Sequence, residues 1–173
     1  AIGVDVDTVR VKTVLEWAEE KGMSTGLVAT SSVTHATPAS FAAHVDYRKK
    51  EFEIAQQYVE TKIDVILGGG KRFWPDSLVS IYKNNGGSFI DRIDTYFDSD
   101  KRLLGLFSEK ALPPVYEGRS PTTTQMAKLA ISKIDKNPNG FFIMIEESQV
   151  DWGGHANSAE YIKGEMASLN DLV

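Results

Sequence analysis

The chain has 173 residues, of which 42% are hydrophobic and 25% are charged, a composition typical of one folded domain spanning residues 1–173. Its 24 acidic residues outnumber its 19 basic residues, and the basic residues are dispersed, which argues against a nucleic-acid partner. No apolar stretch approaches the roughly 20 residues that cross a bilayer, so we expect no membrane span. The sequence contains no cysteine, which excludes disulfides.

Hydrophobic periodicity alternates between helical and extended segments along the chain. In the first segment Val11, Leu15 and Ala18 recur at helical spacing until Gly22 ends the pattern. Pro38 is placed where the first turn of a helix accepts proline. The patterns predict helices over residues 8–21, 39–50, 51–60, 77–84, 122–136 and 159–173, and strands over residues 24–30, 63–67, 88–90, 103–107 and 141–145.

This alternation of strands and helices predicts an α/β fold with a largely parallel sheet covered by helices on both faces. In such sheets, ligands bind beyond the carboxyl ends of the strands. The sequence starts without methionine and stops inside a predicted amphipathic helix. We therefore expect it to be a piece of a longer protein.

The strongest candidate site lies just past the apolar run 140–145, where Glu146, Asp151 and His155 follow a predicted buried strand. Asp151 and His155 are four residues apart, so a helical or turn-like backbone would present both to one ion. Carboxylate oxygen suits magnesium, and carboxylate with imidazole suits zinc, so this segment would serve two different ions. The alternative is that these acids are solvated loop charges, which is how we interpret Glu147.

A second group of polar residues follows the strand predicted to end near Thr30. Thr37 precedes the predicted helix, where threonine most often caps a helix. His35 is either a hydrogen-bonded loop residue or a ligand. Arg48 is either a surface charge or a planar fork for a phosphate or carboxylate, and we expect it to share a helix face with His44, which we interpret as structural.

The segment 68–71, Gly-Gly-Gly-Lys, lacks the spacing of a Walker loop and of a dinucleotide fingerprint, so we interpret it as a tight turn. An alternative function is a non-catalytic α/β module that binds a small anion through this turn and Arg48.

The sequence resembles the alkaline phosphatases in four ordered motifs. These are the segments 34–48, 64–70, 104–107 and 141–157, so the resemblance covers nearly the whole chain. Trp152 and His35 are similar to the residues of marine and cold-adapted bacterial members. Related metal-dependent hydrolases, namely sulfatases, phosphodiesterases and cofactor-independent phosphoglycerate mutases, are the closer alternative.

The resemblance implies roles for particular residues. Thr37 and Glu146 correspond to magnesium ligands, and Asp151 and His155 to ligands of the first of two zinc ions. Arg48 corresponds to the catalytic arginine that grips the substrate phosphate with two parallel hydrogen bonds. The remaining candidates, His35 and Trp152, fall at variable positions near the metals, and we assign them to the surroundings of the metals or to substrate contact.

The resemblance also implies that the intact enzyme hydrolyses phosphate monoesters through a phosphoserine intermediate. We expect the nucleophilic serine to lie upstream of Ala1, and the remaining zinc ligands to lie beyond Val173 or further upstream. The fragment alone is therefore expected to be inactive. For the parent protein, the resemblance implies a homodimer in the periplasm or outside the cell.

Overall fold

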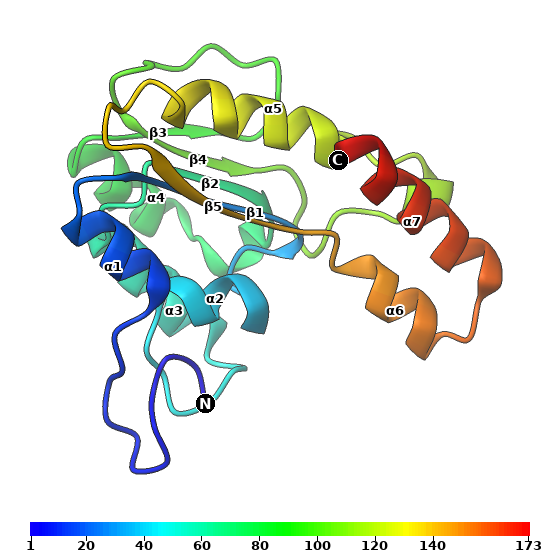
Figure 1. The fold of residues 1–173 in the computed structure, drawn as a ribbon, viewed down its shortest axis with the longest axis horizontal. Helices are drawn as coiled ribbons and strands as arrows, with labels where there is room; N and C mark the ends of the chain where they lie inside the picture. Colours follow the sequence, from blue (N-terminus) through cyan, green and yellow to red (C-terminus); the bar gives the residue numbers. More distant parts are fainter.

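Five parallel strands form the centre of the molecule, which a computed structural model describes over residues 1–173 (Figure 1). The strand order is β3-β4-β2-β1-β5, and every neighbouring pair is parallel, as predicted. The strands are β1 (Ser24–Ser32), β2 (Val65–Gly69), β3 (Gly87–Ile90), β4 (Arg102–Leu106) and β5 (Phe141–Glu146).

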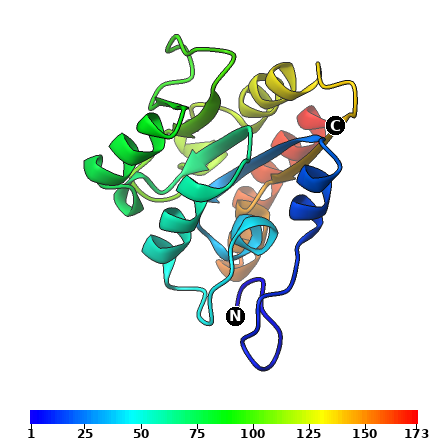
Figure 2. The same cartoon turned by 90° about the vertical axis from the view of Figure 1, so that its left-hand side faces the viewer.

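Helices cover both faces of this sheet. The blue, cyan and teal helices α1 to α3 lie on the opposite side of the strands from the yellow α5 (Figure 2). Beyond the carboxyl end of β5, α6 leads into α7, which packs back against α5 (Figure 1). The α-helices are α1 (Val14–Glu20), α2 (Ala36–Ala42), α3 (Glu51–Glu60), α4 (Asp76–Asn84), α5 (Thr123–Ile134), α6 (Gln149–His155) and α7 (Ala159–Leu172).

Two hydrophobic cores result, one on each face of the sheet. Alternate residues of a strand point to opposite faces, so Leu27 of β1 joins the core under α1 to α4, whereas Val28 joins the core under α5. In β2, Ile66 and Leu67 divide in the same way. Burial on both faces explains why the centres of the strands, such as Val65–Leu67 of β2, are apolar without polar alternation.

Helix α1 is shorter than predicted and begins at Val14. Thr13 caps it: its side chain accepts the backbone N–H of Glu16, and the Glu16 side chain accepts the backbone N–H of Thr13. This capping box satisfies the free amides at a helix start. Residues 1–13 therefore stay outside the helix and form the loop that projects from the body of the molecule (Figures 1 and 2).

The helix predicted over residues 39–50 is wrong at both ends. Helix α2 begins at Ala36, so Pro38 lies in its first turn, and the helix ends at Ala42. Beyond it, Val45 exchanges backbone hydrogen bonds with Ile2, and this long-range pairing draws the chain into an extended conformation. The remaining helices, including the one predicted over residues 51–60, agree to within a few residues.

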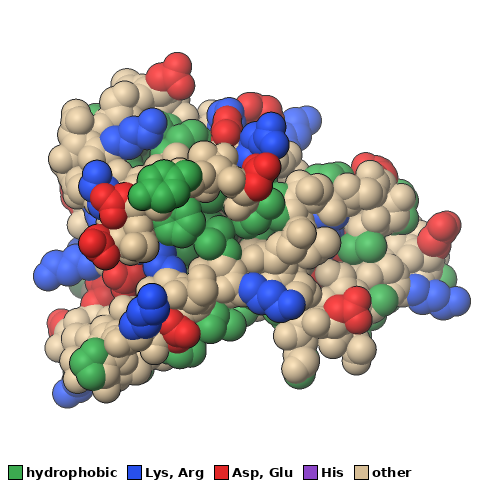
Figure 3. All heavy atoms as spheres, turned by 90° about the horizontal axis from the view of Figure 1, so that it is seen from above, with side chains coloured by type: hydrophobic (Ala, Val, Ile, Leu, Met, Phe, Trp, Pro, Cys, Tyr) green, Lys and Arg blue, Asp and Glu red, His purple; other side chains and the backbone are tan.

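The surface carries charges of both signs. On the face seen from above, acidic and basic side chains are interspersed without a continuous basic area (Figure 3). None of the helices has the length and apolar character that a membrane span requires.

Candidate metal and phosphate site

Asp151 and His155 lie on one face of α6, as their spacing predicts. The Nε2 atom of His155 is 3.5 Å from Oδ1 of Asp151. The His155 side chain is 81% exposed and the Asp151 side chain is 72% exposed, so both donor groups are accessible to an ion from solvent. A carboxylate beside an imidazole is a donor set that suits zinc.

Three distant segments meet beside this helix. The ring of His35, which follows β1, makes an edge-to-face contact with the ring of Trp152 in α6, with centroids 5.9 Å apart. Arg48 reaches the same histidine, with its Nη2 atom 3.4 Å from Nε2 of His35. The structure therefore brings His35, Arg48 and Trp152 together beyond the carboxyl ends of β1 and β5.

Glu146 is the last residue of β5 and stands beside Ala29 of β1 in the strand register. Its Oε2 atom accepts a hydrogen bond from the Ser148 hydroxyl at 2.7 Å. The Ser148 oxygen in turn accepts the backbone N–H of Ser31 at 3.1 Å. Ser148 thus ties the two strand ends together at the candidate site, a role that no feature of the sequence distinguished.

Thr37 is not the cap of α2. The N-cap is His35, whose side chain makes no capping hydrogen bond, and Thr37 lies exposed in the first turn of the helix. The alternative of a simple capping threonine is therefore wrong, and the Thr37 hydroxyl is free for another partner. The Nδ1 atom of His35 is buried without a hydrogen-bond partner, so the hydrogen-bonding capacity of this ring is not fully used within the chain.

His44 and Arg48 do not share a helix face, because α2 ends before either residue. Arg48 is exposed on the loop between α2 and α3. His44 is structural, as interpreted: its Nδ1 atom lies 2.6 Å from the Gly3 carbonyl oxygen, and its Nε2 atom lies 3.1 Å from a carboxylate oxygen of Glu16.

The interpretation of Glu147 as a solvated loop charge is wrong. Its side chain is 2% exposed and pairs with the guanidinium of Arg119, whose own side chain is also 2% exposed. The Thr123 hydroxyl donates to its other carboxylate oxygen at 2.5 Å. Burial raises the pKa of Glu147, against the opposing effects of Thr123 and Arg119.

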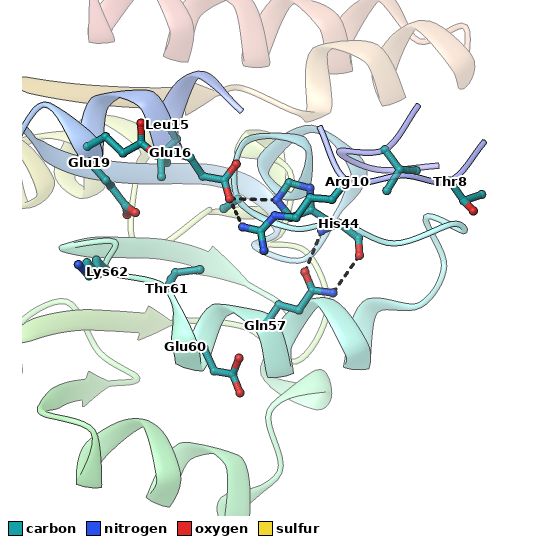
Figure 4. Close-up of a pocket in the computed structure, with 13 residues that line it drawn as sticks. Thr8, Arg10, Leu15, Glu16, Glu19, His44, Gln57, Glu60, Thr61 and Lys62 are labelled. Atoms are coloured by element: carbon teal, nitrogen blue, oxygen red, sulfur yellow. Dashed lines mark hydrogen bonds and ion pairs between the residues drawn. The ribbon is translucent and has the colours of Figure 1, made fainter. Parts of the chain in front are cut away.

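A cavity of about 670 Å³ lies away from the candidate site, between α1, α3 and the N-terminal loop (Figure 4). Glu16 on its wall contacts Arg10 and His44. The Gln57 side chain accepts the backbone N–H of His44 and donates to the His44 carbonyl. Burial alone would raise the pKa of Glu16, but hydrogen bonds from the Thr13 backbone, Arg10 and His44 lower it to about 2. These contacts fasten the N-terminal loop to the body.

The glycine-rich turn offers few donors to an anion. The backbone N–H groups of Gly70 and Lys71 are donated to carbonyl oxygens of residues 108 and 110. The Lys71 ammonium lies 3.3 Å from a carboxylate oxygen of Asp91. The turn is therefore a closed structural element, as interpreted, and it offers the anion-binding alternative no free amide at Gly70 or Lys71.

The side chains of this chain do not by themselves complete a metal centre: no group of three or more histidine, aspartate and glutamate side chains comes together to hold an ion. Asp151 with His155 is a pair, and Glu146 stands apart at the strand end. The donor chemistry nevertheless fits divalent cations, since oxygen donors suit magnesium and the mixed pair suits zinc.

The model of one protein family, "Alkaline phosphatase", matches residues 1–173. The chain belongs to the alkaline phosphatase family. It is 44% identical to alkaline phosphatase 3 and 38% identical to alkaline phosphatase 4 of Bacillus subtilis, in each case over 99% of this chain. It spans 39% of the length of each of these two relatives.

Solved alkaline phosphatases share the fold. The structure of the enzyme from the Antarctic bacterium TAB5 superposes with a TM-score of 0.90 at 37% identity, covering 99% of this chain and 53% of that one. The cold-active enzyme from a psychrophilic Shewanella superposes with a TM-score of 0.93 at 33% identity, covering 99% of this chain and 44% of that one. A variant of the TAB5 enzyme was solved with Mg bound. The predicted resemblance, including its cold-adapted members, is thus confirmed.

Proposed function

We propose that this chain carries part of the metal and phosphate site of an enzyme that hydrolyses phosphate monoesters. The observation that carries the proposal is the meeting of Arg48, His35 and Trp152 beside the exposed Asp151–His155 pair. Membership of the alkaline phosphatase family supports it and disfavours the sulfatase, phosphodiesterase and phosphoglycerate mutase alternatives.

Asp151 and His155 would hold zinc, while Thr37 and Glu146 would contribute to a magnesium site. When bound, such cations stabilise the negative charge that develops on phosphoryl oxygens. The Ser148 hydroxyl donates to Glu146 and thereby orients its carboxylate for this task.

Arg48 would bind two oxygens of the substrate phosphate through its planar guanidinium. Its contact with His35 is long, at 3.4 Å, and therefore competes only weakly with an incoming phosphate. His35 and Trp152 hold this corner together through their ring contact, and both would border the bound substrate.

A zinc site with catalytic function uses three protein ligands, whereas we assign only two zinc ligands in this chain. We therefore propose that further ligands and a nucleophilic serine come from polypeptide outside this chain, and that the chain alone turns over little or no substrate. We extend the proposal to two zinc ions, export from the cytoplasm and a homodimer for the whole protein.

A chimera tests the function. Residues 1–173 would replace the matching segment of Bacillus subtilis alkaline phosphatase 3, and hydrolysis of p-nitrophenyl phosphate would be measured with zinc and magnesium. We expect the chimera to be active, and Arg48→Ala and Asp151→Asn each to reduce kcat/KM by about 100-fold or more. The exposed Arg92→Ala is the matched control. A folded chimera whose kcat/KM is unchanged by Arg48→Ala and Asp151→Asn would refute the proposed function. Clear hydrolysis of p-nitrophenyl phosphate by the isolated chain would refute the proposal that the chain alone is inactive.

A further inference from the structure

A buried ionic network lies directly behind the candidate site. Arg119 is placed between Glu147, at the junction of β5 and α6, and Glu165 of α7. The side chains of all three are at most 2% exposed. One cation between two carboxylates is costly to bury unless every polar atom is hydrogen-bonded.

The network meets that condition and joins four segments. Arg119 Nε donates to the Pro113 carbonyl at 2.9 Å, and Glu165 accepts the backbone N–H of Val115 at 2.9 Å. Glu147 accepts the hydroxyl of Thr123 in α5 at 2.5 Å and, more weakly, that of a serine in α7 at 3.3 Å. The β5–α6 junction is thereby fixed to α5, α7 and the segment 113–119.

Most contacts of helix α6 are made on the side that faces α7, and its N-cap Ser148 also bonds the Ser31 backbone of β1. Its buried residues are Gln149 and Gly153. Gln149 donates to the Leu112 carbonyl and, at 3.4 Å, to the Thr30 carbonyl of β1, and it accepts the hydroxyl of Tyr161 in α7. The opposite face of α6 carries the exposed Asp151–His155 pair, and the half-buried Trp152, between the two faces, contacts His35.

We propose that Glu147 is a positioning residue, which Arg119 and Glu165 hold so that α6 presents Asp151, Trp152 and His155 to the residues that follow β1. The role assigned to these three residues rests on the proposed function. Well-packed apolar residues of similar volume would stabilise a core at least as well as buried ions. Charged groups instead require one hydrogen-bonded geometry, which defines where α6 begins.

The Trp152–His35 ring contact reports the position of α6 without metal or substrate. We would measure the nuclear Overhauser effect between the two rings in the chain and in Glu147→Ala, Glu147→Gln and the control Glu160→Ala, which removes an exposed glutamate of α7. We expect Glu147→Ala to weaken the signal at least twofold. Glu147→Gln keeps the size of the side chain and an acceptor oxygen for Arg119, and its amide N–H can donate to the Thr123 hydroxyl, so it should retain the signal, as should Glu160→Ala.

A folded Glu147→Ala variant with an unchanged ring signal would overturn the proposal, because a merely structural role lowers stability without moving α6. Equal loss in Glu147→Gln would also overturn it. Should Glu147→Ala fail to fold, Thr123→Val removes the 2.5 Å hydrogen bond at nearly constant volume, and an unchanged signal there is the contrary result. The proposed function is tested separately: it fails if the chimeras with Arg48→Ala and Asp151→Asn retain full phosphatase activity.

Discussion

Replacing Arg119 by methionine tests how strongly the buried network stabilises the fold. The substitution removes the only cation between Glu147 and Glu165, whose side chains are 2% and 0% exposed. It also leaves the Pro113 carbonyl without the Nε donor now 2.9 Å away. Methionine fills much of the volume, so the main loss is electrostatic.

The expected cost follows from these contacts. Breaking a buried ion pair by removing one partner costs about 3–5 kcal/mol. In a domain of this size each kcal/mol lowers Tm by about 2–4 °C, so Tm should fall by roughly 6–20 °C. The assay is urea unfolding followed by circular dichroism, with thermal unfolding as a second measure.

The control is Arg92→Met, which removes an arginine whose side chain is 75% exposed and which pairs only with Asp94. Exposed pairs contribute little, so its midpoint should stay close to that of the parent chain. Adding Glu147→Gln to Arg119→Met should recover part of the loss, because one buried carboxylate fewer is then left without its partner. A loss below about 1 kcal/mol in Arg119→Met, the level of a surface pair, would refute the reasoning.

Two further predictions concern α6 and the N-terminal loop. A Cβ on Gly153 would lie 3.0 Å from Cγ1 and 3.1 Å from the backbone nitrogen of Ile162, so Gly153→Ala should destabilise the chain by about 1–3 kcal/mol. The neighbouring Gly154 has no atom within 4 Å of that position, so Gly154→Ala should stabilise it by about 0.5–1 kcal/mol; urea midpoints in the reverse order would contradict the packing of α6 on α7. The pKa of Glu16 lies at about 2 in the folded chain, below its ordinary 4.5, so its contribution to stability is present above pH 4.5 and is lost as the pH falls toward 2. Glu16→Gln should flatten this acid limb of the unfolding midpoint, and an equally steep limb would show that Glu16 is not its source.

Local patterns predicted most of the sheet and the helices that cover it. Residues 51–60 form α3 within the predicted bounds, and Gly22 follows the end of α1 as expected. The failure at residues 39–50 has a long-range cause: Val45 bonds Ile2 and His44 bonds Gly3, more than forty residues earlier. No local propensity records a partner at that separation.

The candidate site, like the fold, was predicted where local patterns decide the structure and missed where distant partners decide it. The spacing of Asp151 and His155 predicted their shared helix face, whereas the pairing of β1 with β5, which brings the two strand ends together, is known only from the structure. Glu146 and Glu147 are chemically alike in the sequence, yet Glu146 is half-buried at the end of β5 and Glu147 is buried against Arg119. That difference depends on Arg119, a partner in the irregular segment before α5 that lies far from Glu147 in the sequence.

The central claim is that residues 35–48 and 146–155 form one binding site for metal and phosphate. A direct measurement is a titration of the isotopically labelled chain with zinc and then inorganic phosphate, followed by the side-chain NMR signals of the histidines, tryptophans and arginines. Zinc should shift His155 and Trp152, and phosphate should then shift Arg48 and His35, while the buried His44 stays unchanged. Shifts confined to His44 and Arg10 at the N-terminal cavity, with Arg48 and His155 unmoved, would contradict the claim.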